Sequence, residues 1–239
     1  MSLSNQSMNT AQQFDKHADT YDADLNQALS VSGESKEYFA LRRARWLERC
    51  VKKLREHPRS ALDYGCGIGD TSILLSQVFK LSAVIGLDVS ERSLELARLR
   101  HASTGCRFSQ FQEHAPAADL DLAYCNGTFH HIPPDERAAT VDYIGRCLRP
   151  GGLFALWENN PWNPGTRYVM AQCTFDHDAI TLTPPEATRL LRAGGFEIVS
   201  VGYLFFFPRV LKFLRFLEPG FSKIPLGAQY QVLARKPLA

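Results

Sequence analysis

A glycine-rich turn between an apolar strand and a helix constrains this chain more than any other feature. Residues 60–66 form a short apolar run that ends in a GxGxG turn, made of Gly65, Gly67 and Gly69, and a helical pattern follows at residues 71–79. Glycines in such a turn let a ligand approach the backbone without meeting a Cβ atom. The N-terminus of the following helix directs amide hydrogens at whatever binds there. The turn therefore predicts a ligand site at the end of a strand.

Strands and helices alternate along most of the chain. The strands expected from apolar runs and turn residues are 60–66, 83–89, 107–111, 120–125, 153–158, 197–206 and 230–235, and the expected helices are 34–56, 71–79, 91–101, 135–148 and the one that a capping box opens at Thr183. Strands separated by helices imply parallel crossovers and a doubly wound α/β sheet. An insert between the last two strands breaks this rhythm, so we expect an antiparallel closing pair.

Two acidic residues sharpen the meaning of the glycine turn. Asp63 stands two residues before the first glycine, and Asp88 ends the next strand in the sequence Gly86-Leu87-Asp88-Val89. A carboxylate at the end of that strand can accept from two ribose hydroxyls. The GxGxG spacing differs from the GxGxxG fingerprint of dinucleotide-binding proteins. The alternative is a plain strand-to-helix turn flanked by solvated acids.

At these residues the chain resembles the class I S-adenosylmethionine-dependent methyltransferases. The resemblance covers residues 15–236 and includes the glycine motif, Asp88, the strand at 121–126 and the turn at 148–152. It implies a Rossmann-like α/β fold, with a doubly wound, mostly parallel seven-stranded sheet, helices on both faces and an antiparallel last strand. It also implies that residues 58–239 bind S-adenosylmethionine and that residues 1–57 form a helical segment covering the active site, as one structural unit.

The resemblance also implies which residues bind the cofactor. The glycine turn is expected to hold the methionine part, Asp88 the ribose, and Val89 the adenine. Gln112 and Glu113 stand where a polar side chain usually meets the adenine amine, although many members have Asp there. The whole set expected to bind the cofactor is Asp63, Gly65, Cys66, Gly67, Asp88, Val89, Gln112, Glu113, Asn126 and Gly127.

Two adjacent histidines, His130 and His131, follow the predicted fourth strand. Ligands of an open α/β sheet bind beyond the carboxyl ends of its strands, and a histidine there can act as a general base near neutral pH. Adjacent side chains usually diverge, so we expect one base at most and prefer His130, with Glu158 orienting its imidazole. The alternative is that one histidine packs, the other orients the loop, and Glu158 is a solvated acid at a strand end.

Four residues are expected to contact the substrate: Tyr21, Phe129, Asn160 and Trp162. In the resembled family a tyrosine of the N-terminal segment often closes over the cofactor; the alternative is a staple residue before the first long helix. Asn160 and Trp162 belong to a rigid loop with two Asn-Pro steps. That loop is superficially similar to the Asn-Pro-Pro-Tyr/Trp motif of adenine-N6 methyltransferases. The motif belongs after the fourth strand, however, so we do not expect a nucleic acid substrate.

The insert at residues 205–217 is both apolar and basic. Helical spacing places Arg209, Lys212 and Arg215 on one side, and the remaining sides are apolar. We expect a helix packed on the sheet, with basic side chains that extend to solvent. The alternative is a surface that contacts lipid or a greasy acceptor.

Composition excludes several classes of protein and site. The 239-residue chain carries 27 basic and 25 acidic residues, and this balance gives no strong field for nucleic acid. The six cysteines lack metal-ligand spacing, so we expect no metal and reduced thiols. The polar N-terminus is not a secretory signal, and the chain lacks the roughly 18 consecutive apolar residues of a membrane span. We therefore expect a cytoplasmic protein.

The resemblance implies direct methyl transfer from S-adenosylmethionine to a small or medium-sized acceptor, which can be hydrophobic, with S-adenosylhomocysteine as the product. One alternative is a nicotinamide-dependent oxidoreductase, against which the GxGxG spacing and the lack of a Tyr-x-x-x-Lys motif argue. The other is a non-catalytic cofactor-binding protein, because a fold alone does not establish chemistry. The sequence leaves open the acceptor, the methylated atom and the oligomeric state.

Overall fold

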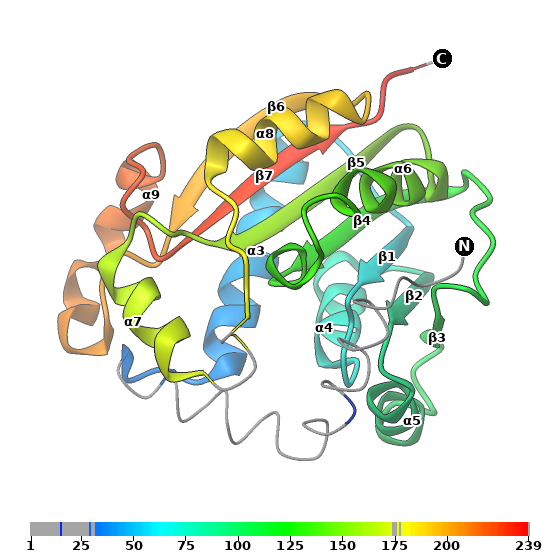
Figure 1. Ribbon diagram of the computed structural model, residues 1–239, viewed down its shortest axis with the longest axis horizontal. Coiled ribbons are helices and arrows are strands. Elements are labelled where there is room, and N and C mark those ends of the chain that lie inside the picture. The colour runs from blue at the N-terminus through cyan, green and yellow to red at the C-terminus, as the bar shows by residue number, and fades with distance from the viewer. Residues whose placement is uncertain (1–14, 16–28, 30–31, 174–175, 177, 239) are drawn as a thin grey trace.

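A seven-stranded sheet in the order β3-β2-β1-β4-β5-β7-β6 organises the part of the chain that the computed structural model describes, residues 15, 29, 32–173, 176 and 178–238 (Figure 1). The strands are β1 (Ser60–Tyr64), β2 (Ala83–Asp88), β3 (Arg107–Gln110), β4 (Leu120–Asn126), β5 (Leu148–Asn159), β6 (Glu197–Leu204) and β7 (Gln229–Arg235). Strand β7 alone runs antiparallel to its neighbours, β5 and β6. The mostly parallel sheet with an antiparallel last strand is therefore confirmed.

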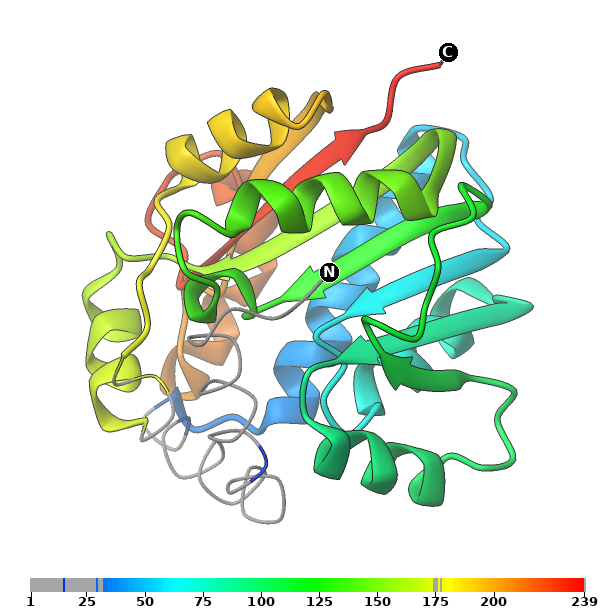
Figure 2. The ribbon, with the colours of Figure 1, turned by 45° about the vertical axis from the view of Figure 1, so that its right-hand side comes forward.

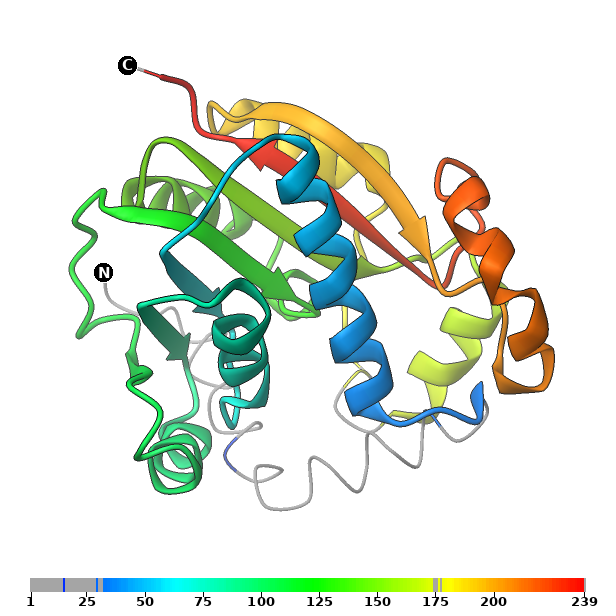
Figure 3. The ribbon, with the colours of Figure 1, turned by 180° about the vertical axis from the view of Figure 1, so that it is seen from behind.

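Helices cover both faces of this sheet, as predicted. They are α3 (Lys36–Lys53), α4 (Asp70–Phe79), α5 (Glu91–Arg100), α6 (Arg137–Cys147), α7 (Pro164–Gln172), α8 (Pro184–Ala193) and α9 (Glu218–Phe221), with 3-10 helices η2 (Phe129–His131) and η4 (Arg209–Leu217). Helices α6 and α8 lie across one face (Figures 1 and 2), and α3 crosses the opposite face (Figure 3).

Alternation along the strands divides the core between the two faces. Leu62 belongs to the buried cluster that contains Ile144 of α6 and Leu191 of α8, whereas the preceding Ala61 belongs to the cluster that contains Leu47 of α3 and Leu75 of α4. A fully buried leucine contributes about 1.5–3 kcal/mol through the hydrophobic effect. Because successive side chains in a strand point to opposite faces, an apolar run buried on both sides fixes β1 at the centre of the sheet.

The strand order reverses next to β1. The chain builds β2 and β3 on one side of β1 and then returns to place β4 on the other. Such a switch point opens a crevice at the carboxyl ends of the strands, where ligands of doubly wound proteins bind. The glycine turn after β1 and the two histidines of η2 after β4 both lie at this end.

Three elements differ from the sequence prediction. Strand β5 begins at Leu148, so the predicted turn at 148–152 lies within the strand. Helix α7 was not predicted, although Asn163 caps it and Pro164 occupies its first turn. The expected packing of residues 205–217 on the sheet is wrong, because η4 contains no buried residue. Tyr21 and most of the segment 1–31 lie outside the described residues, so its covering of the active site stays a prediction. None of the described helices is long and apolar enough to cross a membrane.

Candidate active site

A cavity of about 1070 Å³ lies at the carboxyl ends of the central strands. Ligand pockets usually measure about 300–1,000 Å³, so this one has room for more than one small ligand. Most predicted site residues line it: Gly65, Gly67, Asp88, Val89, Gln112, Asn126, Gly127, His130 and His131.

The glycine turn and Asp88 are built as one unit. Asp88 Oδ2 accepts a hydrogen bond from the Gly67 amide at 2.8 Å, and its Oδ1 accepts one from the Ser90 amide at 3.0 Å. Burial raises the pKa of the Asp88 carboxyl, against the opposing effect of these amides. A Cβ at Gly65, whose φ is +75°, would lie 2.2 Å from Thr128 Oγ1. The turn therefore needs glycine both for its backbone conformation and for the close approach of the η2 loop.

Three residues of the predicted cofactor set stand away from the cavity wall. Asp63 is buried and accepts a hydrogen bond from Ser72 Oγ at 2.7 Å, and burial raises its pKa to about 7. Cys66 is buried beside the turn. Glu113 accepts a hydrogen bond from the Gln110 amide at 3.3 Å. Asp63 thus joins the end of β1 to the start of α4 through Ser72. Of the two residues after β3, Gln112 rather than Glu113 lines the cavity.

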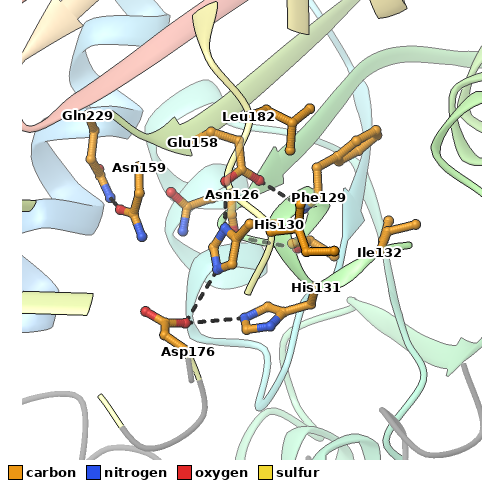
Figure 4. A network of polar contacts seen from close by, with 12 residues as sticks. Asn126, Phe129, His130, His131, Ile132, Glu158, Asn159, Asp176, Leu182 and Gln229 are labelled. Carbon is orange, nitrogen blue, oxygen red and sulfur yellow. Dashed lines mark hydrogen bonds and ion pairs between the residues drawn. The ribbon is translucent and has the colours of Figure 1, made fainter. Parts of the chain in front are cut away.

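A chain of polar contacts joins both histidines to two carboxylates (Figure 4). Glu158, at the end of β5, accepts from the Phe129 amide at 2.8 Å and lies 2.6 Å from His130 Nδ1. The Nε2 atoms of His130 and His131 each lie 3.4 Å from Asp176 Oδ1. Glu158 therefore lies where it can orient the His130 ring, and it is a buried group (1% exposed) rather than a solvated acid.

The two histidines differ in protonation. Although burial disfavours its charged form, the carboxylates of Glu158 and Asp176 raise the pKa of His130 to about 10. Burial and the nearby charge of His130 lower the pKa of His131. Despite burial, hydrogen bonds from both histidines lower the pKa of Asp176 to about 2. At neutral pH His130 is thus a cation with both ring nitrogens engaged, which does not suit the predicted base, whereas His131 is neutral.

The charge on His130 should make stability depend on pH. An unfolded histidine has a pKa of about 6.5, so the raised folded value of about 10 stabilises the fold fully below about pH 6.5. This contribution is lost as the pH rises through about 10. We expect the free energy of unfolding in urea to fall between pH 6 and pH 10, and His130→Gln to remove part of that fall. The exposed His57→Gln is the control, and equal slopes in all three proteins would contradict the assignment.

The three predicted substrate contacts that lie in the described part of the chain, Phe129, Asn160 and Trp162, do not line the cavity. Phe129 is completely buried. Asn160 is also buried, and its Nδ2 donates to the carbonyls of Pro225 and Gly227 at 3.1 and 2.8 Å. Both side chains thus contribute to the scaffold, and their contact with a substrate stays a prediction. Trp162 is 44% exposed and does not line the cavity.

Arg43 of α3 is a cavity residue that the sequence analysis missed. Its Nη1 donates to Gln229 Oε1 at 2.9 Å and its Nε to the Tyr124 hydroxyl at 3.2 Å. The side chain is buried, and among the described residues it has no carboxylate partner. A buried cation with neutral partners favours an anionic ligand group. The available signal was its position on the apolar stripe of α3, four residues before Leu47.

The fold and the cavity define a Rossmann-like α/β protein whose ligand site lies at the switch point of the sheet. A family model described as "Methyltransferase domain" matches residues 61–152. The trans-aconitate 2-methyltransferase of Methylobacterium radiotolerans is 34% identical over 42% of this chain, but the match covers only 38% of that relative. The ubiquinone biosynthesis O-methyltransferase of Leptothrix cholodnii is 31% identical over 65% of this chain and 71% of the relative.

A solved structure agrees with these relatives. The S-adenosylmethionine-dependent methyltransferase of Thermotoga maritima has a TM-score of 0.62 and 19% identity, and the alignment covers 93% of this chain and 98% of that one. At this identity the likeness shows the fold alone. Taken with the sequence matches, it confirms the resemblance: the chain belongs to the class I S-adenosylmethionine-dependent methyltransferase family.

Proposed function

We propose that this protein transfers a methyl group from S-adenosylmethionine to an acceptor bound in the same cavity. The observation that carries the proposal is Asn126 Oδ1, a buried acceptor atom on the cavity wall without a hydrogen-bond partner. A buried polar group in this state calls for a donor, and the ammonium group of the methionine part supplies one.

The remaining cofactor residues suit the same ligand. A carboxylate has about four acceptor sites, and the two backbone amides on Asp88 leave two for the ribose hydroxyls. Among the described residues other than its two chain neighbours, no atom lies within 4 Å of the place where a Cβ on Gly67 would stand, so this part of the turn has room for a ligand. Arg43 offers a charged donor to a carboxylate, either of the methionine part or of the acceptor.

The bound donor supplies a methyl group already activated by its sulfonium, so the protein mainly positions the acceptor for direct displacement. We propose a small or medium-sized acceptor with an apolar body. The cavity wall beyond the cofactor residues supports this, since it includes Tyr38, Phe39, Val169, Met170, Phe205 and Phe206. We further propose a hydroxyl as the methylated group, in keeping with the O-methyltransferase among the relatives, and His131 as the base that takes its proton.

A cytoplasmic location is also part of the proposal. Five cysteines, Cys50, Cys66, Cys106, Cys125 and Cys147, are free thiols, and three of these are buried. Free thiols are typical of a reducing compartment.

Cofactor choice gives the first test of the function. S-adenosylhomocysteine at about 100 times its Kd should add about 2.7 kcal/mol of stability. For a domain of this size, that corresponds to a Tm increase of about 5–10 °C. NADH should produce no shift in the same thermal denaturation experiment. A shift with NADH alone would favour the oxidoreductase instead.

Methyl transfer needs its own assay. The protein is incubated with methyl-labelled S-adenosylmethionine and a panel containing trans-aconitate, a short-chain demethylated quinol and a polar lipid extract, and labelled products are separated. We expect label in a hydroxyl-bearing acceptor. Stabilisation by S-adenosylhomocysteine without transfer to any acceptor would favour the non-catalytic cofactor-binding alternative.

A further inference from the structure

The 3-10 helix η4 presents large apolar side chains to solvent. Val210, Phe213 and Phe216 are 81%, 66% and 76% exposed, and Leu211 and Leu217 are each 38% exposed. We name these five residues the apolar platform. Because side chains three residues apart in a 3-10 helix lie above one another, Phe213 and Phe216 share a face. Monomeric proteins rarely expose contiguous apolar patches, so this surface calls for something that covers it.

The helix is held by its basic side chains rather than by its apolar ones. Arg215 forms an ion pair with Glu34 at 2.8 Å and stacks over the Tyr38 ring at 4.7 Å. Arg209 donates to the Gly33 carbonyl at 3.2 Å. These contacts tie η4 to the start of α3 while the platform stays outside the core. Exposing a large apolar side chain costs about 1.5–3 kcal/mol relative to burying it.

The charge around the platform is one-sided. Residues 205–228 contain four basic residues, Arg209, Lys212, Arg215 and Lys223. Their only acid, Glu218, is buried and forms an ion pair with Arg42 at 2.7 Å. Arg215 is neutralised by its ion pair with Glu34, so Arg209, Lys212 and Lys223 give the segment its net positive charge, although the whole chain is nearly balanced. A surface that combines exposed aromatic side chains with lysine and arginine is typical of segments that lie in the interface of an anionic membrane.

The platform is also continuous with the cavity. The cavity wall includes the three residues that precede η4, Phe206, Phe207 and Pro208. It also includes Arg215, which belongs to η4. Figure 1 shows η4 and α9 at one end of the sheet, on the same side as α7. An acceptor held in a lipid layer against the platform would thus lie next to the apolar part of the cavity.

We propose that the apolar platform docks onto an anionic membrane surface and that the acceptor is a lipid-soluble molecule taken from that surface. The second part rests on the proposed methyl transfer; the docking itself does not. The basic residues provide attraction at long range, and the aromatic side chains provide burial on contact.

Vesicle binding tests the docking. The full chain is sedimented with vesicles of phosphatidylcholine alone and of phosphatidylcholine mixed with phosphatidylglycerol. We expect binding to the mixed vesicles that weakens with salt, and a loss of at least about tenfold in the double variant Phe213→Ser/Phe216→Ser, by the transfer energy of two large apolar side chains. Lys212→Gln should weaken binding about fivefold, from about 1 kcal/mol per basic residue.

Leu99→Ser is the matched control, because Leu99 is as exposed as Phe216 (both 76%) but lies on α5. It should bind vesicles like the unmodified protein, and circular dichroism should show all variants folded. Two results would overturn the docking: no binding to the mixed vesicles, or a dimer in light scattering that the double variant abolishes, since a second copy would then cover the platform. The S-adenosylhomocysteine shift is measured on the same samples. If it persists without vesicle binding, only the docking fails; if vesicles bind but the shift is absent, only the proposed function fails.

Discussion

Replacing Asp88 by alanine is expected to weaken binding of S-adenosylhomocysteine by about 10- to 150-fold. The reason is the loss of charge-assisted hydrogen bonds from a buried site, which contribute about 1.5–3 kcal/mol. Asp88 also accepts from the Gly67 amide at 2.8 Å, so the substitution releases the glycine turn as well as the ribose. Isothermal titration calorimetry of the two proteins measures the difference.

Two further variants separate these contributions. Asp70→Ala removes a carboxylate from the first residue of α4, close to the turn, where Asp70 is 45% exposed and forms an ion pair with Lys36. We expect its cofactor affinity to stay within about twofold of normal, as for most exposed ion pairs. Asp88→Asn keeps the shape of the side chain but loses its charge, and it should fall between the other two. An Asp88→Ala protein that is folded and binds normally would show that the ribose lies elsewhere.

Much of the fold could be predicted because its central strands carry local signals. The apolar run that ends in glycine predicts both the place of β1 in the sheet and its end. Such a strand must be buried on both faces and must end at a turn. The resemblance, rather than periodicity, supplied the strand order. Helix α7 was missed because its start, with two Asn-Pro steps around Trp162, has the composition of a loop, although proline is well placed in the first turn of a helix.

The segment 205–217 shows that helical periodicity cannot predict which side of a helix packs against the protein. Helical spacing correctly separated the basic from the apolar side chains of η4, but it carries no information on which side meets the protein. The partner that decides this is Glu34, 181 residues from Arg215 in the chain. An ion pair over that separation inverts the expected packing and leaves Phe213 and Phe216 exposed.

The protonation of the two histidines could not be predicted for a similar reason. His130 and Glu158 could be paired from the sequence, because both follow adjacent central strands at the same edge of the sheet. Asp176 lies after α7 in a stretch without periodicity, and its approach to 3.4 Å from both imidazoles had no sequence signal. Glu158 and, to a smaller extent, Asp176 raise the pKa of His130 against the effect of burial, and only the first of these carboxylates could be placed from the sequence.

Replacing His131 by alanine is therefore expected to slow catalysis more than replacing His130. A placed imidazole contributes about 10²–10⁴-fold to proton removal from a hydroxyl, so kcat should fall by that factor on a hydroxyl acceptor. Cofactor affinity should stay near normal, because the proposed ribose and methionine contacts are made by Asp88, the glycine turn and Asn126 rather than by the His131 side chain. Single-turnover methyl transfer at saturating S-adenosylmethionine measures the chemical step without the binding step.

The pH profile distinguishes a base from a structural histidine. The pKa of His131 is lowered from its usual value of about 6.5, so the normal enzyme should hold a constant rate above about pH 6.5 and lose activity as the pH falls through the lowered value. In His131→Ala this acid limb should disappear along with the rate. His114→Ala removes another histidine on the cavity wall and should keep both the rate and the limb.

An acceptor that needs no base gives the strictest control for His131. A carboxylate is a nucleophile as it stands, so His131→Ala should then retain nearly the normal rate, while the hydroxyl acceptor shows the full loss. Equal losses on both acceptors would mean that His131 only positions the substrate. If His131→Ala remains active on a hydroxyl while His130→Gln collapses at the same stability, the proton goes to His130, and the imidazolium held between Glu158 and Asp176 must give up its proton when substrate binds.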